Sequence, residues 1–208
     1  PIIVDMYNGD VIGAEAGERP HIKAGGKAKI SIATDVGNKS TAYGVFLENV
    51  SHVYIRNLEI SNQAAQRQIS LGVGVVASSG GVVSDIHLDN LYVHDVSGTL
   101  LDKNIPNGGI YFYVSDMNGL TRYDDISIEN CMVKNVSRQA ISVGFTSNWD
   151  AWEKASKGGI IPDEILETQA HTNMVIRNNY IEDAGGDSIV PMYSIAPLVE
   201  YNVSNGAS

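Results

Sequence analysis

Aspartates recur at matching positions of a repeated pattern, and a pair of aspartates can act as acid and base. Four segments align without a gap on an asparagine, at Asn57, Asn90, Asn130 and Asn178. Five positions past these asparagines lies a second column, made of Asn62, Asp95, Asn135 and Asp183. If the repeats stack as coils about 4.8 Å apart, the backbones of Asp95 and Asp183 lie about 10 Å apart. Side chains can shorten this to the roughly 6.5 to 9.5 Å that an inverting glycosidase leaves for its water.

Two more aspartates lie close to this column. Asp187 and Asp183 flank an Ala-Gly-Gly turn, and Asp102 lies seven residues beyond Asp95 in an expected loop. A single aspartate beside glycine is equally well explained as a turn cap. Because four carboxylates gather at one expected corner, we interpret Asp95, Asp102, Asp183 and Asp187 as candidate catalytic residues.

Aromatic residues suggest how a sugar would be held. Alternation along residues 109–114 places Tyr111 and Tyr113 on the outside of the coil, where two rings can form a stacking platform. Trp149 and Trp152 stand in a long insertion that we expect to fold over the same face, and indole rings pack well on the faces of sugars. The alternative is that the tryptophans pin the loop to the coil wall.

Histidines and basic residues add two further candidates. His94 is outward beside Asp95, where it can assist that acid or simply be solvated. Arg138 and Lys134 are the basic residues close to the aspartate column, and we expect Arg138 to contact substrate. The remaining histidines lie at unrelated register positions, at His21, His52, His87 and His171. We therefore expect no metal site and no cofactor.

The elements that must position these residues are short strands. Before and after each aligned asparagine, apolar residues alternate with polar ones, and a second alternating piece accompanies each segment, at residues 44–49, 72–77, 109–114, 140–145 and 188–193. Three strands per repeat predict one all-β domain over residues 1–208, a right-handed parallel β-helix of about six coils. The aligned asparagines are expected to bond to the backbone of the next coil and so to stabilise its corners, rather than to bind a ligand.

Insertions and chain ends complete the expected organisation. Repeat spacings of 33, 40 and 48 residues require inserted loops, placed at 97–108, 115–123 and 145–172, and residues 150–169 alone have a helical composition. Neither end resembles a cap. We therefore expect a fragment of a longer β-helix whose open coil ends pair with another chain or with the rest of the same β-helix.

Composition excludes several classes of protein. The chain has 208 residues, 14 Lys and Arg against 24 Asp and Glu, and a net charge of −10 without a basic cluster, which argues against nucleic acid as a partner. One cysteine, Cys131, cannot build a disulfide framework or a multi-cysteine zinc site. Apolar runs are too short for a membrane span, and no signal peptide is visible.

Several motifs together resemble a known family. The segments HDVSG (94–98), GGIYF (108–112), NNYIEDAGGDSIVPM (178–192) and PLVEYNV (197–203) resemble bacterial β-helix repeat proteins of the PbH1 type that act on carbohydrates. Among these, the chain is most similar to glycoside hydrolase family 136, the lacto-N-biosidase type. This resemblance implies a carbohydrate-active, glycan-binding enzyme that is secreted or at the cell surface.

The leading functional hypothesis is therefore a glycoside hydrolase that acts on neutral oligosaccharides or glycans through paired carboxylates. A polysaccharide lyase acting on uronate polymers is the enzyme alternative, although a net charge of −10 favours a neutral substrate. A non-catalytic glycan-binding solenoid is the third possibility, because fold alone does not imply chemistry.

Overall fold

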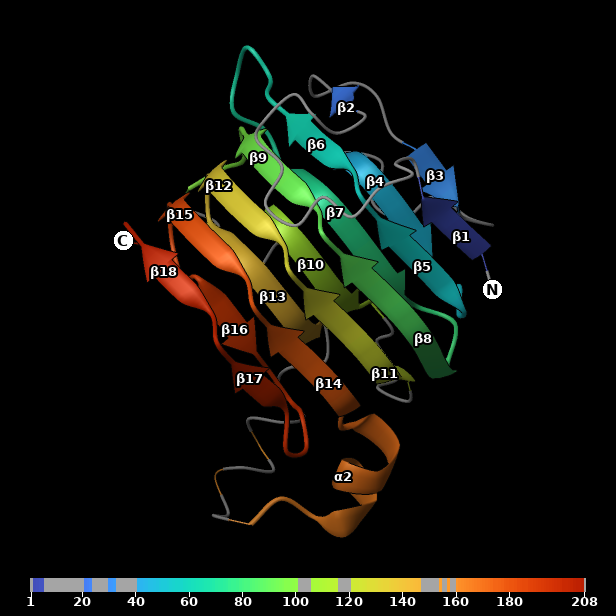
Figure 1. Ribbon diagram of the computed structural model, residues 1–208. Helices are drawn as coiled ribbons and strands as arrows, with labels where there is room; N and C mark the ends of the chain where they lie inside the picture. Colours follow the sequence, from blue (N-terminus) through green and yellow to red (C-terminus); the bar gives the residue numbers. More distant parts are fainter. Residues whose placement is uncertain are drawn as a thin grey trace.

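The computed structural model describes residues 2–5, 21–23, 30–32, 41–100, 106–115, 121–146, 154, 157 and 160–207. In these ranges most residues lie in strands, which form three parallel six-stranded sheets (Figure 1). The first sheet contains, in spatial order, β1 (Ile2–Asp5), β5 (Val53–Arg56), β8 (Gly81–Asp89), β11 (Thr121–Glu129), β14 (Thr172–Arg177) and β17 (Leu198–Glu200). The second sheet contains β2 (His21–Lys23), β6 (Glu59–Asn62), β9 (Tyr92–Val96), β12 (Met132–Val136), β15 (Tyr180–Ala184) and β18 (Val203–Asn205). The third sheet contains β3 (Ile30–Ile32), β4 (Ala42–Glu48), β7 (Ser70–Ala77), β10 (Gly108–Val114), β13 (Gln139–Thr146) and β16 (Ile189–Pro191).

From β4 onward the chain visits the third, first and second sheets in turn and then repeats. The successive coils are β4–β6, β7–β9, β10–β12, β13–β15 and β16–β18, while β1, β2 and β3 add one more strand to each sheet. Every strand pairs in parallel with the equivalent strand of the next coil, as β5 pairs with β8. The predicted all-β, right-handed parallel β-helix of about six coils is confirmed.

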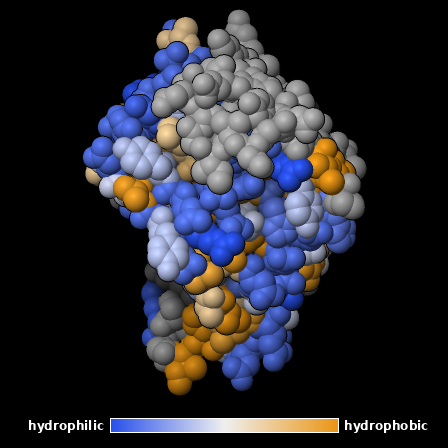
Figure 2. All heavy atoms as spheres, in the orientation of Figure 1, coloured by the Kyte–Doolittle hydropathy of each residue, from blue (hydrophilic) through white to orange (hydrophobic). Residues whose placement is uncertain are grey.

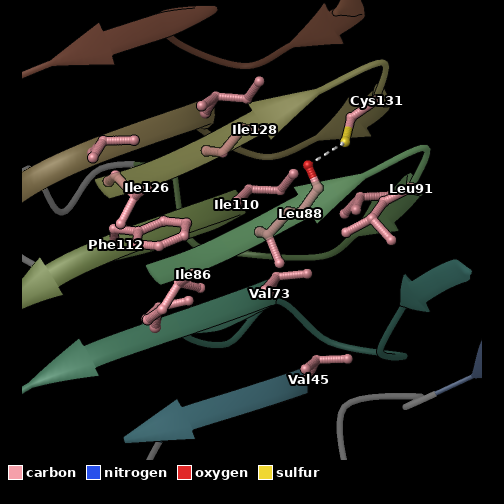
Figure 3. Close-up of a cluster of buried hydrophobic side chains, with 14 of the residues drawn as sticks. Val45, Val73, Ile86, Leu88, Leu91, Ile110, Phe112, Ile126, Ile128 and Cys131 are labelled. Carbon is pink, nitrogen blue, oxygen red and sulfur yellow. Dashed lines mark hydrogen bonds between the residues drawn. The ribbon is translucent and has the colours of Figure 1, made fainter. Parts of the chain in front are cut away.

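Inward side chains of the three sheets stack in rows along the helix axis and form one core. Figure 3 shows Val45, Val73 and Ile110 in one such row, and their strands pair these residues directly. Ile86 pairs with Ile126 in the same way on the first sheet. These side chains are almost fully buried. The alternation read from the sequence therefore identified the inward face correctly.

The aligned asparagines occupy the corner between the first and second sheets. Asn57, Asn90, Asn130 and Asn178 all have φ between 51° and 60°, a left-handed conformation that asparagine tolerates better than most residues. Their backbone amides donate to the next coil, as Asn90 does to the Glu129 carbonyl at 3.0 Å. Asn90 Nδ2 donates to Asn57 Oδ1 at 2.8 Å, a bond between side chains of adjacent coils. These asparagines therefore have the left-handed geometry of a corner and link neighbouring coils through both backbone and side chain.

The second column differs from its prediction at one position. Asp95, Asn135 and Asp183 follow one another across β9, β12 and β15, each with φ near 50°. Asn62 does not belong with them, because β6 pairs Asn62 with Val96 and leaves Asp95 as an extra residue. This bulge turns two consecutive residues outward from β9 onward. Asn62 is instead fully buried and donates to the carbonyls of Ala42 and Leu71.

Three longer segments separate strands in the part of the chain where insertions were predicted. The chain leaves the strands at residues 97–107, 115–120 and 147–171, so Thr121, which was expected in a loop, already begins β11. The last insertion contains α2 (Asp163–Gln169), within the one segment whose composition favoured a helix. A loop at 63–69 was not singled out from the sequence.

A buried histidine joins the third and first sheets. His171 is 1% exposed, and its Nδ1 accepts a hydrogen bond from the Tyr123 backbone amide at 3.0 Å. Because Nδ1 must be unprotonated for this bond, Nε2 carries the proton and faces the Gly144 carbonyl at 3.4 Å. Burial lowers the pKa of His171 to about 4, and the charge of Arg122 adds to this effect.

Lowering the pH from 7 to 5 should destabilise the fold through His171. Below pH 6.5 the unfolded chain binds a proton at this histidine that the folded chain does not accept until about pH 4. The stabilisation is therefore complete above pH 6.5 and is lost as the pH falls toward 4, by about 2 kcal/mol between pH 7 and 5. Urea unfolding of the wild type and of His171→Gln at both pH values measures how much of the change in unfolding free energy comes from His171. An equal pH dependence in both proteins would contradict it.

Candidate functional site

Two of the predicted site residues meet on the outer face of the second sheet. The bulge in β9 turns His94 and Asp95 outward together, and His94 Nδ1 lies 2.9 Å from an Asp95 carboxylate oxygen. The other ring nitrogen, His94 Nε2, lies 3.0 Å from Glu59 Oε1. The Glu59 side chain is only 4% exposed and His94 is 12% exposed. His94 is therefore held between two carboxylates rather than solvated.

Asp95 is kept ionised by its neighbours. Burial is the largest single influence on its pKa and acts upward, but hydrogen bonds from His94 and Asn135 outweigh it, so the pKa lies below its ordinary value. Asn135 Nδ2 donates to Asp95 Oδ1 at 2.5 Å from the next coil. Asp183 follows Asn135 in the same column. This row therefore presents a carboxylate, an amide and a second carboxylate at coil spacing.

A second group of predicted residues converges just after the corner into the third sheet. Gln139, at the start of β13, accepts hydrogen bonds from the Tyr111 hydroxyl and from Arg138 Nε, the latter at 3.2 Å. Its own Nε2 donates to Asp187 Oδ2 at 3.3 Å. Gln139 thus connects Tyr111, Arg138 and Asp187, three residues that sequence reasoning chose separately.

The tyrosine platform expected from the sequence is not present as an open surface. Tyr111 and Tyr113 do point away from the main core, as predicted, but they are 2% and 8% exposed and belong to a second hydrophobic cluster with Tyr43 and Phe46. Burial raises the pKa of both hydroxyls. Alternation indicates which way a side chain leaves the coil but not whether another part of the molecule covers it. Tyr111 therefore reaches the site through its hydroxyl rather than through its ring face.

The loop that leads to Asp102 is fastened to the same corner. Ser137 accepts from the Gly98 amide at 2.6 Å, and Arg138 donates to the Leu100 carbonyl at 3.1 Å. A side chain at residue 98 would place its Cβ 2.0 Å from the amide oxygen of Asn107, so this close approach requires glycine. Asp102 itself lies outside the described residues.

Sequence reasoning missed three residues that build this corner, namely Arg67, Asn107 and Gln139. Arg67 donates to the Gly98 carbonyl at 3.1 Å and to Ser137 Oγ at 3.0 Å. Asn107 is fully buried and accepts from the Ser70 amide at 3.2 Å. None of them belongs to a repeated column. The one signal in the sequence was the spacing between repeats, which required an inserted loop at 97–108.

The long insertion leaves the coil from the opposite end of the third-sheet strands. β13 begins at the corner with Gln139 and ends at Thr146, and the insertion follows Thr146. Its helix α2 lies beside β11, at the end of the coils away from the tips of β9, β12 and β15 (Figure 1). Figure 2 shows hydrophobic side chains next to hydrophilic ones at the end of the molecule that carries α2. The described part of this insertion lies against the first sheet, and its folding over the face of Tyr111 and Tyr113 stays a prediction. Trp149 and Trp152 lie outside the described residues.

Histidines that seemed unrelated in sequence meet on the first sheet. Asp85 accepts from the Tyr54 hydroxyl at 2.6 Å and lies 2.6 Å from His52 Nδ1 and 3.0 Å from His87 Nε2. These contacts, led by the Tyr54 hydrogen bond, lower the pKa of Asp85 to about 2. Asp125 Oδ1 lies 4.0 Å from the same His87 nitrogen. The two histidines do lie in different columns, but His52 is in register with Asp85 on the neighbouring coil and His87 lies two residues beyond Asp85 on the same strand.

Among the described residues, no helix is both long and apolar enough to cross a membrane. No family model matches the chain.

The chain is nevertheless similar to proteins of known activity. It is 31% identical over 221 residues to the lacto-N-biosidase of Bifidobacterium longum subsp. longum, covering 88% of this chain and 14% of that protein. The native crystal structure of the GH136 lacto-N-biosidase from Eubacterium ramulus matches with a TM-score of 0.77 and 33% identity over 89% of this chain. Its selenomethionine derivative matches with a TM-score of 0.80 and 32% identity over 98% of this chain. The chain spans 33% and 35% of those two structures. In sequence and in fold, it thus resembles a part of the family 136 lacto-N-biosidases, as its own motifs predicted.

Proposed function

We propose that this chain forms part of a glycoside hydrolase that acts on neutral oligosaccharides through paired carboxylates. The observation that carries the proposal is that Asp95, Asp187 and the residues that lead to Asp102 all lie where the chain passes from the second sheet to the third, on different coils of the stack. The similarity to lacto-N-biosidases supports the same class of reaction.

Asp95 is the candidate for the charged member of the pair. A glycosidase needs one carboxylate that is ionised, to attack the sugar or to activate water, and one that is protonated, to release the leaving group. The hydrogen bonds from His94 and Asn135 keep the pKa of Asp95 low, which suits the first role. Glu59 holds the other side of the His94 ring and so fixes its orientation.

Asp187 is the best-placed described candidate for the acid. Its carboxylate is held by Gln139, next to Arg138 and the Tyr111 hydroxyl, which are groups that can donate hydrogen bonds to sugar oxygens. Asp183 is a weaker candidate, because its left-handed conformation and its column position match those of Asn135, which needs no carboxylate there. Asp102 is a further candidate for the acid, and Trp149 and Trp152 stay predicted sugar contacts.

The lyase alternative is less well supported by the basic residues. A lyase must neutralise a uronate and abstract a proton, and Lys134 is already paired with Glu182 at 3.0 Å. Arg138 donates to Gln139 and to the Leu100 carbonyl. The net charge of −10 also opposes an anionic polymer. A binding solenoid without chemistry predicts that sugar affinity persists when the aspartates are replaced.

Substitution of the two leading carboxylates tests the catalytic assignment. We expect Asp95→Asn and Asp187→Asn each to lower kcat at least about a hundredfold while KM changes only several-fold, because an acid or a base is lost but sugar contacts remain. Turnover of a chromogenic neutral disaccharide by the full protein measures both constants.

Asp183→Asn and Asp89→Asn are matched controls for that experiment. Asp183 shares its column with Asn135, so asparagine fits there, and Asp89 flanks the asparagine corner elsewhere, accepting from Asn130 at 2.7 Å. Asp89→Asn should retain full turnover. Loss of activity in Asp183→Asn with normal Asp187→Asn would reassign the acid to Asp183. If Asp95→Asn and Asp187→Asn both keep normal turnover, the aspartates stabilise turns and the assignment fails.

A substrate panel distinguishes the three candidate functions. A hydrolase should release reducing sugar from neutral oligosaccharides, and the product should lack a carbon–carbon double bond. A lyase should cleave uronate polymers, give an unsaturated product that absorbs ultraviolet light, and regain activity when calcium follows chelation. We expect the first pattern. Saturable binding of neutral sugar without any cleavage would support the binding solenoid instead.

Secretion or display at the cell surface, in a bacterium, remains part of the proposal and rests on the family resemblance.

The edge strands of the last coil expose apolar side chains, among them Leu198, Val199 and Val203. These edges are the place where we expect another chain or more of the same β-helix to pair.

A further inference from the structure

A cluster of imidazole and carboxylate groups lies on the first sheet, away from the corner that carries Asp95. One ligand atom each from Asp85, His87 and Asp125 lies within 4.8 Å of the others. His87 Nε2 is 3.0 Å from Asp85 Oδ1 and 4.0 Å from Asp125 Oδ1. In a tetrahedral zinc site with bonds of about 2.0 to 2.1 Å, ligand atoms are separated by roughly 3.3 Å. The observed separations lie on either side of this value.

The backbone holds these side chains together across neighbouring coils. Asp85 and Asp125 occupy equivalent positions of β8 and β11, and both have left-handed φ values, of 57° and 52°. His87 stands two residues beyond Asp85 on the same strand and points to the same outer face. Ligands from two adjacent coils therefore converge without any change of register.

Charge favours a cation between these groups. Two carboxylates face one ring nitrogen, but a neutral imidazole has one proton there at most and can donate it to only one of them. Within the described part of the chain, the ion-pairing partners of Asp85 and Asp125 are histidines, with no lysine or arginine. A divalent metal would balance both negative charges at once.

Neighbouring groups already fix the orientation that a metal site needs. His87 Nδ1 lies 2.8 Å from Ser127 Oγ, so a proton on Nδ1 is accommodated and Nε2 is left to coordinate. On the other side, His52 Nδ1 and the Tyr54 hydroxyl each lie 2.6 Å from Asp85 oxygens. The side chains of Asp85 and His87 are 25% and 23% exposed, so solvent reaches the cluster.

We propose that Asp85, His87 and Asp125 form a zinc site, with His52 and Ser127 as positioning residues and the fourth ligand supplied by solvent. The imidazole and carboxylate donors are those that zinc accepts in proteins. Bound zinc joins β8 to β11 and stabilises the coil stack. This site does not depend on the proposed hydrolase activity.

Calorimetric titration of the full, metal-free protein with zinc chloride tests the site. One zinc ion should bind per chain, and a hundredfold excess over Kd should raise the Tm by roughly 5 to 10 °C. His87→Ala should weaken binding at least about a hundredfold and Asp125→Asn about tenfold or more, and Ser127→Ala should cost about tenfold as an outer-shell change. Cobalt in place of zinc should give the intense visible spectrum of a four-coordinate site in the wild type alone.

Asp89→Asn is the matched control, because Asp89 also lies on β8 but accepts a hydrogen bond from Asn130 and does not belong to the cluster. The zinc affinity of Asp89→Asn should stay within about twofold of that of the wild type. The Asp125 side chain is 59% exposed, so Asp125→Asn keeps the test valid if His87→Ala does not fold. No zinc binding, or equal zinc binding after both substitutions, would overturn the proposal. Equal binding would move the metal to another group, such as His94 with Glu59 and Asp95.

Discussion

Parallel hydrogen-bond ladders between coils are the constraint on which this molecule depends. Every strand must stay in register with its counterpart in the next coil, so each corner must turn the chain by the same geometry every time. Left-handed residues recur in three columns. Asn90 represents the corner between β8 and β9, while Asp85 and Asp95 represent bends within β8 and β9. Asparagine and aspartate tolerate this conformation better than other residues with a Cβ. Polar corner columns therefore arise from backbone geometry before any function is considered.

The same columns bring carboxylates close together, and each carboxylate needs a partner. Coils repeat at about 4.8 Å, so an aspartate in one coil faces the corresponding residue of the next. Asp95 forms hydrogen bonds with His94 and Asn135, and Asp85 forms them with His52 and Tyr54. A stack of corners is thus a place where catalytic or metal-binding groups can form from residues that first serve the turn.

Polar groups inside the coils follow a stricter rule, because water cannot satisfy them. Asn179 replaces the apolar residue found at this inward position in earlier coils, and it is 1% exposed. Its side chain accepts from the Cys131 amide and donates to the Ile128 carbonyl, both at 2.9 Å. Asn202 continues the same bonding in the next coil, donating to the Ile176 carbonyl at 2.9 Å. Full pairing is what makes a buried amide compatible with the core.

The sequence by itself determined the solenoid, its three strands per coil, the inward rows and the asparagine corners, because these features repeat and depend on local alternation. It also selected Asp95, His94, Arg138 and Asp187, which the tertiary structure places in two groups, His94 with Asp95 and Arg138 with Asp187 through Gln139. Only the tertiary structure decided that Tyr111 is covered, since burial depends on what packs over a strand from elsewhere in the chain. It also decided that Asn62 leaves its column through a bulge, and that His52 and His87 share Asp85, because register across coils is not encoded by spacing along one strand.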